Sequence, residues 1–140
     1  MTALRLLLFR CGGQVCAVEA GAVREILAAS EPTRIPGSPP AVLGLVNVRG
    51  TLVPVVDAAA AVGLNGTPRA GTLVLVDRGG KPVALAVDEV LDLVSAEASA
   101  LDDHVALPGV RSDLVRAVGT AGGHSFVQLA IHALLEPLLP

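Results

Sequence analysis

Aromatic side chains are almost absent from this 140-residue sequence, which has no tryptophan, no tyrosine and two phenylalanines. It therefore lacks the stacking platform with which many proteins bind single-stranded nucleic acid. The net charge of −3 has the wrong sign for a phosphate backbone, and the ten basic residues are scattered along the chain. These absences argue against nucleic-acid binding and predict a core of aliphatic side chains.

Long apolar runs are missing as well. No stretch reaches the roughly 18 uninterrupted apolar residues of a membrane-spanning helix. The short apolar run near the start is followed by Arg10 and Cys11, without a small-residue cleavage site. We therefore expect no membrane insertion, no secretory leader and a cytoplasmic location.

Only two cysteines are present, and they flank Gly12-Gly13. In a two-residue hairpin turn Cys11 would face Gln14, and Cys16 would face Phe9. The cysteines would then be diagonal neighbours, with Cβ atoms nearer ~7 Å apart than the ~4 Å of a disulfide. This geometry favours two buried thiols over a disulfide.

Signals of catalysis and of metal binding are weak. The glycines at 79–82 lack the spacing of a phosphate-binding loop, and "GHSFV" lacks the second glycine of a nucleophile elbow. Asp102-Asp103-His104 could hold a hard metal or move a proton, but a polar loop explains the same residues. We expect no enzymatic activity, no metal and no cofactor. The alternative function is that of a small β-barrel that binds a metabolite or a metal.

Glycine pairs between apolar runs are the most regular feature that is present. They occur in "LLLFRCGGQVCAV", "LVLVDRGGKPVALAV" and "AVGTAGGHSFVQLAI", and "NVRGTL" is similar. Glycine supplies the positive φ of tight hairpin turns, so each stretch predicts a β-hairpin. Short strands joined by such turns are typical of small barrels or a sandwich.

The sequence also repeats itself at a shift of 67 residues. Residues 6–27 align with residues 73–94, and the glycine pairs coincide. Three apolar pairs coincide too: Val23 with Val90, Ile26 with Leu93 and Leu27 with Val94. The repeat favours two similar β-subdomains over one large barrel, with a third hairpin near residues 114–131 completing one of them.

Helix signals are few. "DAAAAVGL" predicts about two helical turns, with Asp57 as N-cap and Gly63 as the stop. "IHALLEPLL" predicts a second short helix that ends at Pro137. Residues 31–40 contain four prolines and predict a loop or an extended connection.

The stretch "GLVNVRGTLVPVVD", residues 44–57, predicts a hairpin whose central turn residues are Arg49 and Gly50. Val48 would then face Thr51, and Gly50 would take a positive φ. Arg49 would stand at the tip with its guanidinium available. Taken alone, these residues favour an ordinary hairpin with an exposed arginine, but that interpretation does not account for the patterned segment around them.

That segment resembles the signature of the CheW-like domain of bacterial chemosensory systems. Members typically have Ile-Pro, a proline, a glycine, Asn-Leu-Arg-Gly and then Pro-Val-Ile-Asp. The corresponding residues here are Ile35-Pro36, Pro39, Gly44, Asn47-Val48-Arg49-Gly50 and Pro54-Val55-Val56-Asp57. "VREIL" at 23–27 and "ALAVDEVLDLV" at 84–94 agree with the flanks, and the resemblance runs from about residue 4 to residue 136.

The resemblance implies a mainly β fold of two SH3-like five-stranded barrels with one or two short helices, in one domain over residues 1–140. It implies a non-catalytic adaptor, located in the cytoplasm at receptor arrays. Its partners would be the regulatory domain of a CheA-type histidine kinase and the cytoplasmic tip of methyl-accepting chemoreceptors.

The resemblance also implies which residues bind these partners. Asn47, Arg49 and Gly50 would form or support the receptor-facing surface, with Val23 and Glu25 nearby. A second segment implicated in partner contacts corresponds to Val87, Asp88 and Val90.

Overall fold

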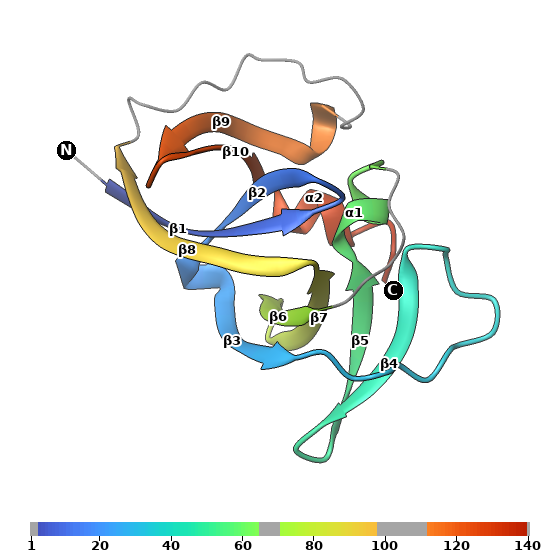
Figure 1. Cartoon of the computed structure of the whole chain (residues 1–140). Helices are drawn as coiled ribbons and strands as arrows, with labels where there is room; N and C mark the ends of the chain where they lie inside the picture. Colours follow the sequence, from blue (N-terminus) through green and yellow to red (C-terminus); the bar gives the residue numbers. More distant parts are fainter. Residues whose placement is uncertain (1–2, 65–70, 98–111, 140) are drawn as a thin grey trace.

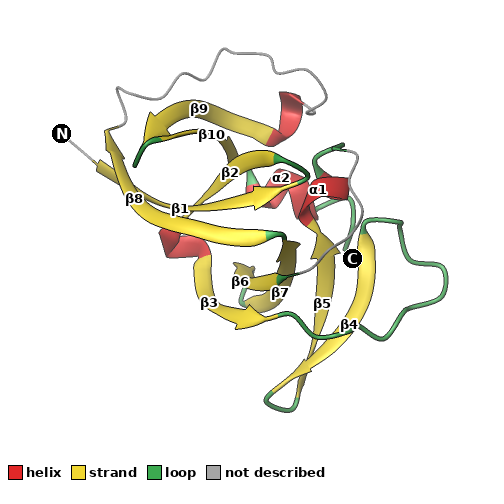
Figure 2. Cartoon of the chain, in the orientation of Figure 1, coloured by secondary structure: helices red, strands yellow, loops and turns green. Residues whose placement is uncertain are grey.

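The structure, a computed structural model, describes residues 3–64, 71–97 and 112–139. Most of these residues lie in strands (Figure 1), and the helical segments are short (Figure 2). The strands are β1 (Ala3–Cys11), β2 (Gln14–Glu19), β3 (Val23–Ala28), β4 (Val42–Val48), β5 (Thr51–Asp57), β6 (Thr72–Arg78), β7 (Lys81–Val87), β8 (Glu89–Glu97), β9 (Val115–Ala121) and β10 (His124–Leu129). The helical segments are α1 (Ala58–Ala61), α2 (Ile131–Leu135) and the 3₁₀ turns η1 (Ala20–Ala22) and η3 (Ser112–Leu114).

Four tight turns occur where the sequence predicts them. They are Gly12-Gly13, Arg49-Gly50, Gly79-Gly80 and Gly122-Gly123, and every residue in them has a positive φ. Two successive positive φ angles are typical of the type I′ turn, whose twist matches that of paired strands. Val48 faces Thr51 across its turn, as predicted. The predicted hairpins are therefore confirmed.

The ten strands form two five-stranded sheets, which curve into two small barrels. Barrel 1 has the strand order β8-β1-β2-β10-β9, and barrel 2 has the order β3-β6-β7-β5-β4. The internal repeat makes β1, β2 and β3 equivalent to β6, β7 and β8. The β9-β10 hairpin completes barrel 1, as the sequence suggested for residues 114–131. The predicted fold class of two SH3-like barrels is confirmed.

An exchange of strands between the barrels was not predicted. In each repeat the first two strands form a hairpin, β1-β2 or β6-β7, and the third strand pairs with the hairpin of the other repeat. β3 therefore pairs with β6, and β8 pairs with β1. In Figure 1, β8 runs beside β1 in one barrel while β3 lies against the other. Neither repeat can complete a barrel by itself, because each needs the third strand of the other.

Alternation along the strands divides the apolar side chains between three clusters. β1 places Leu6 and Leu8 inside barrel 1 and directs Leu7 and Phe9 into the junction between the barrels. A third cluster, which includes Val55, fills barrel 2. Burial of this aliphatic surface supplies the main driving force for folding.

The two helices are short. α1 has four residues where about two turns were predicted, and it ends near Gly63, whose φ is 87°. Asp57 directly precedes α1, but no side-chain hydrogen bond caps the helix. α2 ends before Pro137, as predicted.

The two cysteines are free and buried, as predicted. Cys11 faces Gln14 and Cys16 faces Phe9. Their Sγ atoms lie 3.3 Å apart, in hydrogen-bonding contact, which is closer than the diagonal placement of the two residues suggested. The hydrogen bond with Cys11, together with burial, raises the pKa of Cys16 far above its ordinary value. The Cys16 side chain therefore remains a thiol at neutral pH.

Replacement of Gly44 by alanine is expected to destabilise the fold strongly. Gly44 has a φ of 144°, and a Cβ there would lie 2.2 Å from the carbonyl oxygen of Thr33. Thr33 forms a bridge to Leu45 that holds the preceding connection against β4. Backbone strain and overpacking together should lower the free energy of unfolding of Gly44→Ala by about 3 kcal/mol or more in urea denaturation.

Gly80→Ala is the matched control for this prediction. Gly80 also has a positive φ, of 88°, but a Cβ there would meet no heavy atom within 4 Å. The free energy of unfolding of Gly80→Ala should fall only by the cost of backbone strain at a positive φ, about 1 kcal/mol. If the two variants lose the same free energy of unfolding, the close packing of Gly44 against Thr33 does not contribute to stability.

Candidate functional site

The β4-β5 hairpin carries three of the predicted site residues at its tip. Gly50 has a φ of 86°, as predicted, and Arg49 unexpectedly has a positive φ as well, of 49°. The backbone N–H of Gly50 donates a hydrogen bond of 2.8 Å to Oδ1 of Asn47. Asn47 therefore closes the turn and supports Arg49 from within the hairpin.

Arg49 occupies a backbone conformation that disfavours most side chains. A positive φ costs a non-glycine residue about 1–2 kcal/mol, and asparagine or glycine would suit the same turn position better. The Arg49 side chain is nonetheless 70% exposed and contributes little to packing. A long cation held in a strained, exposed position is more consistent with a contact to another molecule than with a role in folding.

The guanidinium of Arg49 is paired, contrary to the expectation that it would be available at the tip. Its Nη2 atom donates a hydrogen bond of 2.5 Å to Oε2 of Glu25 on β3. This bond lowers the pKa of Glu25 and raises the pKa of Arg49. Since solvent screens the pair, it adds little stability, but it fixes the direction in which the guanidinium points.

An open groove of about 340 Å³ lies beside this ion pair. It is lined by residues of β3, the β4-β5 hairpin, β6 and β7: Arg24, Glu25, Val48, Arg49, Thr51, Val53, Leu75 and Pro82. The lining combines apolar side chains with three charged ones. Such a lining suits an amphipathic helix better than a small polar ligand.

The predicted valines lie at the junction between the barrels. Val23 and Val90 are half-buried against the central cluster, at equivalent positions of the repeat. Val87 belongs to that cluster and is only 1% exposed. The predicted partner contact of Val87 therefore has no exposed side chain to make it, whereas Val23 and Val90 both reach the surface.

Asp88 lies between β7 and β8, where its backbone N–H donates a hydrogen bond of 2.9 Å to the carbonyl oxygen of Arg10. Its side chain is exposed, but its charge acts on the buried Asp57 at the end of β5. Burial is the main cause that raises the pKa of Asp57, and the negative charge of Asp88 adds to it. Asp88 thus has two roles at the junction: its backbone forms a hydrogen bond with Arg10, and its charge raises the pKa of Asp57.

The predicted site residues therefore form two groups. Glu25, Asn47, Arg49 and Gly50 meet beside the groove, and Val23, Val87, Asp88 and Val90 lie at the junction. Arg24 was not predicted as a site residue; it pairs with Asp77 and also donates a 3.0 Å hydrogen bond to the carbonyl oxygen of Gly80. The repeat could have suggested Asp77, because that position is equivalent to Arg10, which pairs with Glu89.

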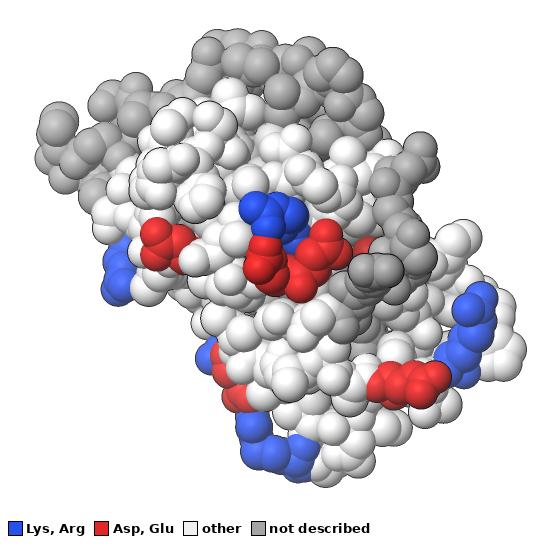
Figure 3. All heavy atoms as spheres, in the orientation of Figure 1, with Lys and Arg blue, Asp and Glu red and all other residues white. Residues whose placement is uncertain are grey.

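Charged side chains do not form a large field of one sign on the face in Figure 3. They form small clusters in which acidic and basic atoms adjoin, with uncharged surface between them. This pattern favours association through apolar contact with local ion pairs over long-range steering.

None of the helices in the described ranges has the length and apolar character that a membrane span requires. Among the described residues, no three His, Cys, Asp or Glu side chains come close enough together to hold a metal ion. Asp102-Asp103-His104 lies outside the described residues.

Comparison with known proteins gives a family match along nearly the whole chain. The model of a family described as CheW-like domain matches residues 5–138. The probable chemotaxis protein CheW of Rhizobium etli is 34% identical over 113 residues, which are 79% of this chain and 71% of that protein. The chemotaxis protein CheW of Rhizobium meliloti is 33% identical over 114 residues, which are 80% and 72% of the two chains.

A solved structure has the same fold. The scaffolding protein TtCheW from Thermoanaerobacter tengcongensis matches with a TM-score of 0.85, over 96% of this chain and 89% of that one. The sequence identity is 18%, so this likeness shows the fold alone.

Replacement of Arg49 by asparagine is expected to stabilise the protein. Asparagine tolerates the positive φ of this turn position, and only a solvent-exposed ion pair is lost. The free energy of unfolding should rise by about 0.5–1 kcal/mol in urea denaturation. Arg49→Lys, which keeps both the charge and the strain, should stay within about 0.5 kcal/mol of the natural protein. A clear loss of stability in Arg49→Asn would mean that the pair with Glu25 is structural.

Replacement of Asp57 by asparagine is expected to stabilise the protein at neutral pH. An acid with a raised pKa in the folded state contributes stability below its pKa in the unfolded chain, and this stability is lost as the pH rises through the raised value. Asp57→Asn carries no charge, so its advantage in unfolding experiments should be largest at neutral pH and disappear as the pH falls toward 3.8. An advantage that is the same at every pH would contradict the electrostatic cause.

Proposed function

The chain belongs to the CheW-like domain family, and on this premise we propose that it couples a CheA-type histidine kinase to methyl-accepting chemoreceptors. The family consists of scaffold and adaptor proteins of bacterial chemotaxis. The proposed action is binding without turnover or cofactor, in the cytoplasm at receptor arrays. The observation that carries the proposal is Arg49, a strained and exposed cation held by Asn47 and Glu25 beside an open groove.

We assign the receptor tip to this groove. A chemoreceptor tip is a helical hairpin, and a helix lies well along apolar side chains flanked by charges. Val48 and Pro82, which are both partly exposed, supply the apolar contacts, while Arg49 and Glu25 offer a cation and an anion. The half-buried Val23 and Val90 would extend the same surface toward the junction.

The kinase regulatory domain would bind elsewhere, because an adaptor must hold both partners at the same time. Barrel 1 offers Leu93 of β8, a large apolar side chain that is 47% exposed. It belongs to a different barrel from Arg49, so a surface around Leu93 would leave the groove open.

Residues 1–140 would act as one unit in this function. β3 belongs to the first repeat but lies in barrel 2, and β8 belongs to the second repeat but lies in barrel 1. A conformational change in either barrel therefore acts on a strand that the other repeat contributes. We therefore treat the two barrels as a single domain with two faces.

Each contact is expected to be modest in strength. Aromatic side chains, which often dominate binding energy, are nearly absent from this chain. Dissociation constants in the micromolar range, near −8 kcal/mol, would follow for each partner alone. Arrays would gain strength because each captured partner raises the effective concentration of the next.

Replacement of Arg49 by glutamate tests the receptor assignment. The reversed charge would lie against Glu25 and face the receptor with the wrong sign. Affinity for a soluble receptor-tip fragment, measured by calorimetry, should fall at least tenfold, about 1.4 kcal/mol. Folding should change little, by about 0.5 kcal/mol, because the site is exposed.

Arg5→Glu is the control, since Arg5 is exposed on β1 of barrel 1, and its receptor affinity should be unchanged. If Arg49→Glu binds both partners normally, the assignment of Arg49 is wrong. If Arg49→Glu loses its thermal transition, Arg49 has a structural role instead.

A further inference from the structure

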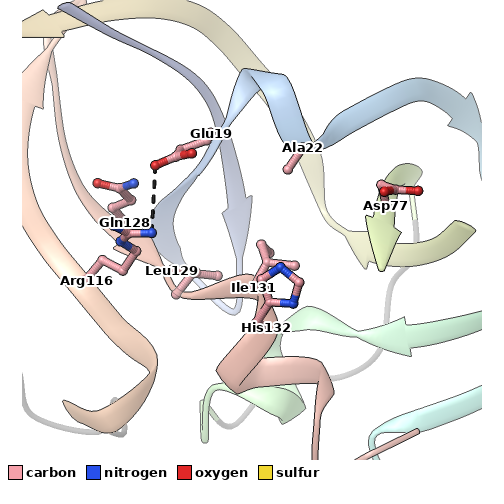
Figure 4. Close-up of a pocket in the computed structure, with 8 residues that line it drawn as sticks. All are labelled: Glu19, Ala22, Asp77, Arg116, Gln128, Leu129, Ile131 and His132. Atoms are coloured by element: carbon pink, nitrogen blue, oxygen red, sulfur yellow. Dashed lines mark ion pairs between the residues drawn. The ribbon is translucent and has the colours of Figure 1, made fainter. Parts of the chain in front are cut away.

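A second hollow, of about 120 Å³, lies at one end of barrel 1 and faces barrel 2. Figure 4 shows the side chains that surround it. They are Glu19, Ala22, Asp77, Arg116, Gln128, Leu129, Ile131 and His132. Asp77 comes from β6 of barrel 2, so both barrels contribute to the wall. Junctions of this kind and the mouths of β-barrels are common places for ligand sites.

The internal repeat allows each position in barrel 1 to be compared with its equivalent in barrel 2. Three of the polar residues that line the hollow occupy positions where barrel 2 has an apolar residue. Gln128 lies opposite Ala17 on the parallel strand β2, just as Val55 lies opposite Ala84 on β7. Gln128 and Val55 are therefore equivalent positions in the two barrels, and Val55 is buried in an apolar cluster.

The other two replacements follow from the same registers. Glu19 faces Leu6 as Ala86 faces Leu73. Arg116 lies within the register shift of the β9-β10 pair, as Leu43 does in the β4-β5 pair. Barrel 2 thus places Leu43, Val55 and Ala86 where barrel 1 places Arg116, Gln128 and Glu19. Folding of the barrel does not require these polar side chains.

The side-chain carboxamide of Gln128 has no hydrogen-bond partner in the part of the chain that the structure describes, although the residue is only 2% exposed. A buried carboxamide without a partner is unfavourable, because it has lost its bonds to water. In the described residues, no fully enclosed side-chain nitrogen or oxygen lacks a partner. The free carboxamide atoms of Gln128 must therefore open into the hollow that the residue lines.

Glu19 and Arg116 bring opposite charges to the same wall. Their closest atoms are 3.8 Å apart, too far for a hydrogen bond, and their side chains are 45% and 62% exposed. Each charge therefore keeps hydrogen-bonding capacity for a third molecule. On the opposite wall (Figure 4), Asp77 is already paired with Arg24.

We infer that this hollow binds a small zwitterion of the α-amino acid class. Arg116 holds the ligand carboxylate, and Glu19 holds the ligand ammonium group. The carboxamide of Gln128 either donates a hydrogen bond to the carboxylate or accepts one from the ammonium group. Leu129 and Ile131 face the ligand's side chain. A volume of about 120 Å³ corresponds to about four water molecules, which restricts the ligand to the smallest amino acids. A molecule with one charge would leave the opposite charge of the wall unused.

The experiment is a titration of the intact protein with L-alanine and with its two single-charge analogues, followed by NMR. Propionate lacks the ammonium group of alanine, and ethylamine lacks its carboxylate. The side-chain NH₂ signals of Gln128, assigned by their absence from Gln128→Val, report directly on the hollow. Alanine should shift these signals to saturation at millimolar concentration or below, and neither analogue should do so at tenfold higher concentration.

Variants separate ligand binding from folding. Gln128→Val introduces the residue of the equivalent position in barrel 2, so it should melt at the same temperature as the natural protein or higher. It should nevertheless lose alanine binding, measured by calorimetry, and so should Glu19→Gln. Glu31→Gln, at an exposed position outside the hollow, is the matched control and should bind normally.

Three results would overturn the inference. The first is the absence of any alanine-dependent shift in the folded protein. The second is equal binding of propionate or ethylamine. The third is undiminished alanine binding by Gln128→Val and Glu19→Gln. The test is independent of the adaptor function, because it uses neither the kinase nor the receptor.

Discussion

The exchange of β3 and β8 between the barrels is the constraint on which the rest of the structure depends. It brings Glu25, on a strand from the first repeat, next to Arg49 on the hairpin of barrel 2. An ion pair joins each exchanged strand to its new neighbour, Arg24 with Asp77 in one barrel and Arg10 with Glu89 in the other. Asp77 and Arg10 are equivalent positions, but their partners Arg24 and Glu89 are not, so each barrel forms its own ion pair at this seam.

The repeat also shows how two similar barrels acquire different surfaces. Their interiors keep the same apolar positions, such as Leu6 and Leu73, because these positions decide the fold. The ends of the barrels are less constrained. At one end of barrel 1, Gln128 stands where barrel 2 has Val55, and a polar hollow replaces apolar packing. The proposed sites of this protein therefore lie on a repeated scaffold without being repeated themselves.

Much of this fold could be predicted from the sequence, because glycine pairs and alternation are local signals. These signals predicted the positions of four turns. They also predicted that Val48 pairs with Thr51 and that Gly50 has a positive φ. The strand exchange was not predictable, since the repeat shows which segments are alike but not which of them pair. The Arg49–Glu25 ion pair depends on that exchange; the family resemblance placed Glu25 near Arg49, but no local signal predicted that the two would pair. The unpartnered side chain of Gln128 depends on its surroundings in the folded protein and has no local signal in the sequence.

The central claim is that this protein holds a kinase and a receptor together through separate surfaces. It is tested most directly by co-sedimentation of the natural chain with receptor-tip assemblies and a soluble kinase regulatory domain. The account predicts that the kinase domain enters the pellet only when the adaptor is present, and that saturating receptor does not release it. If receptor and kinase displace each other from the adaptor, the two surfaces overlap and the account is wrong.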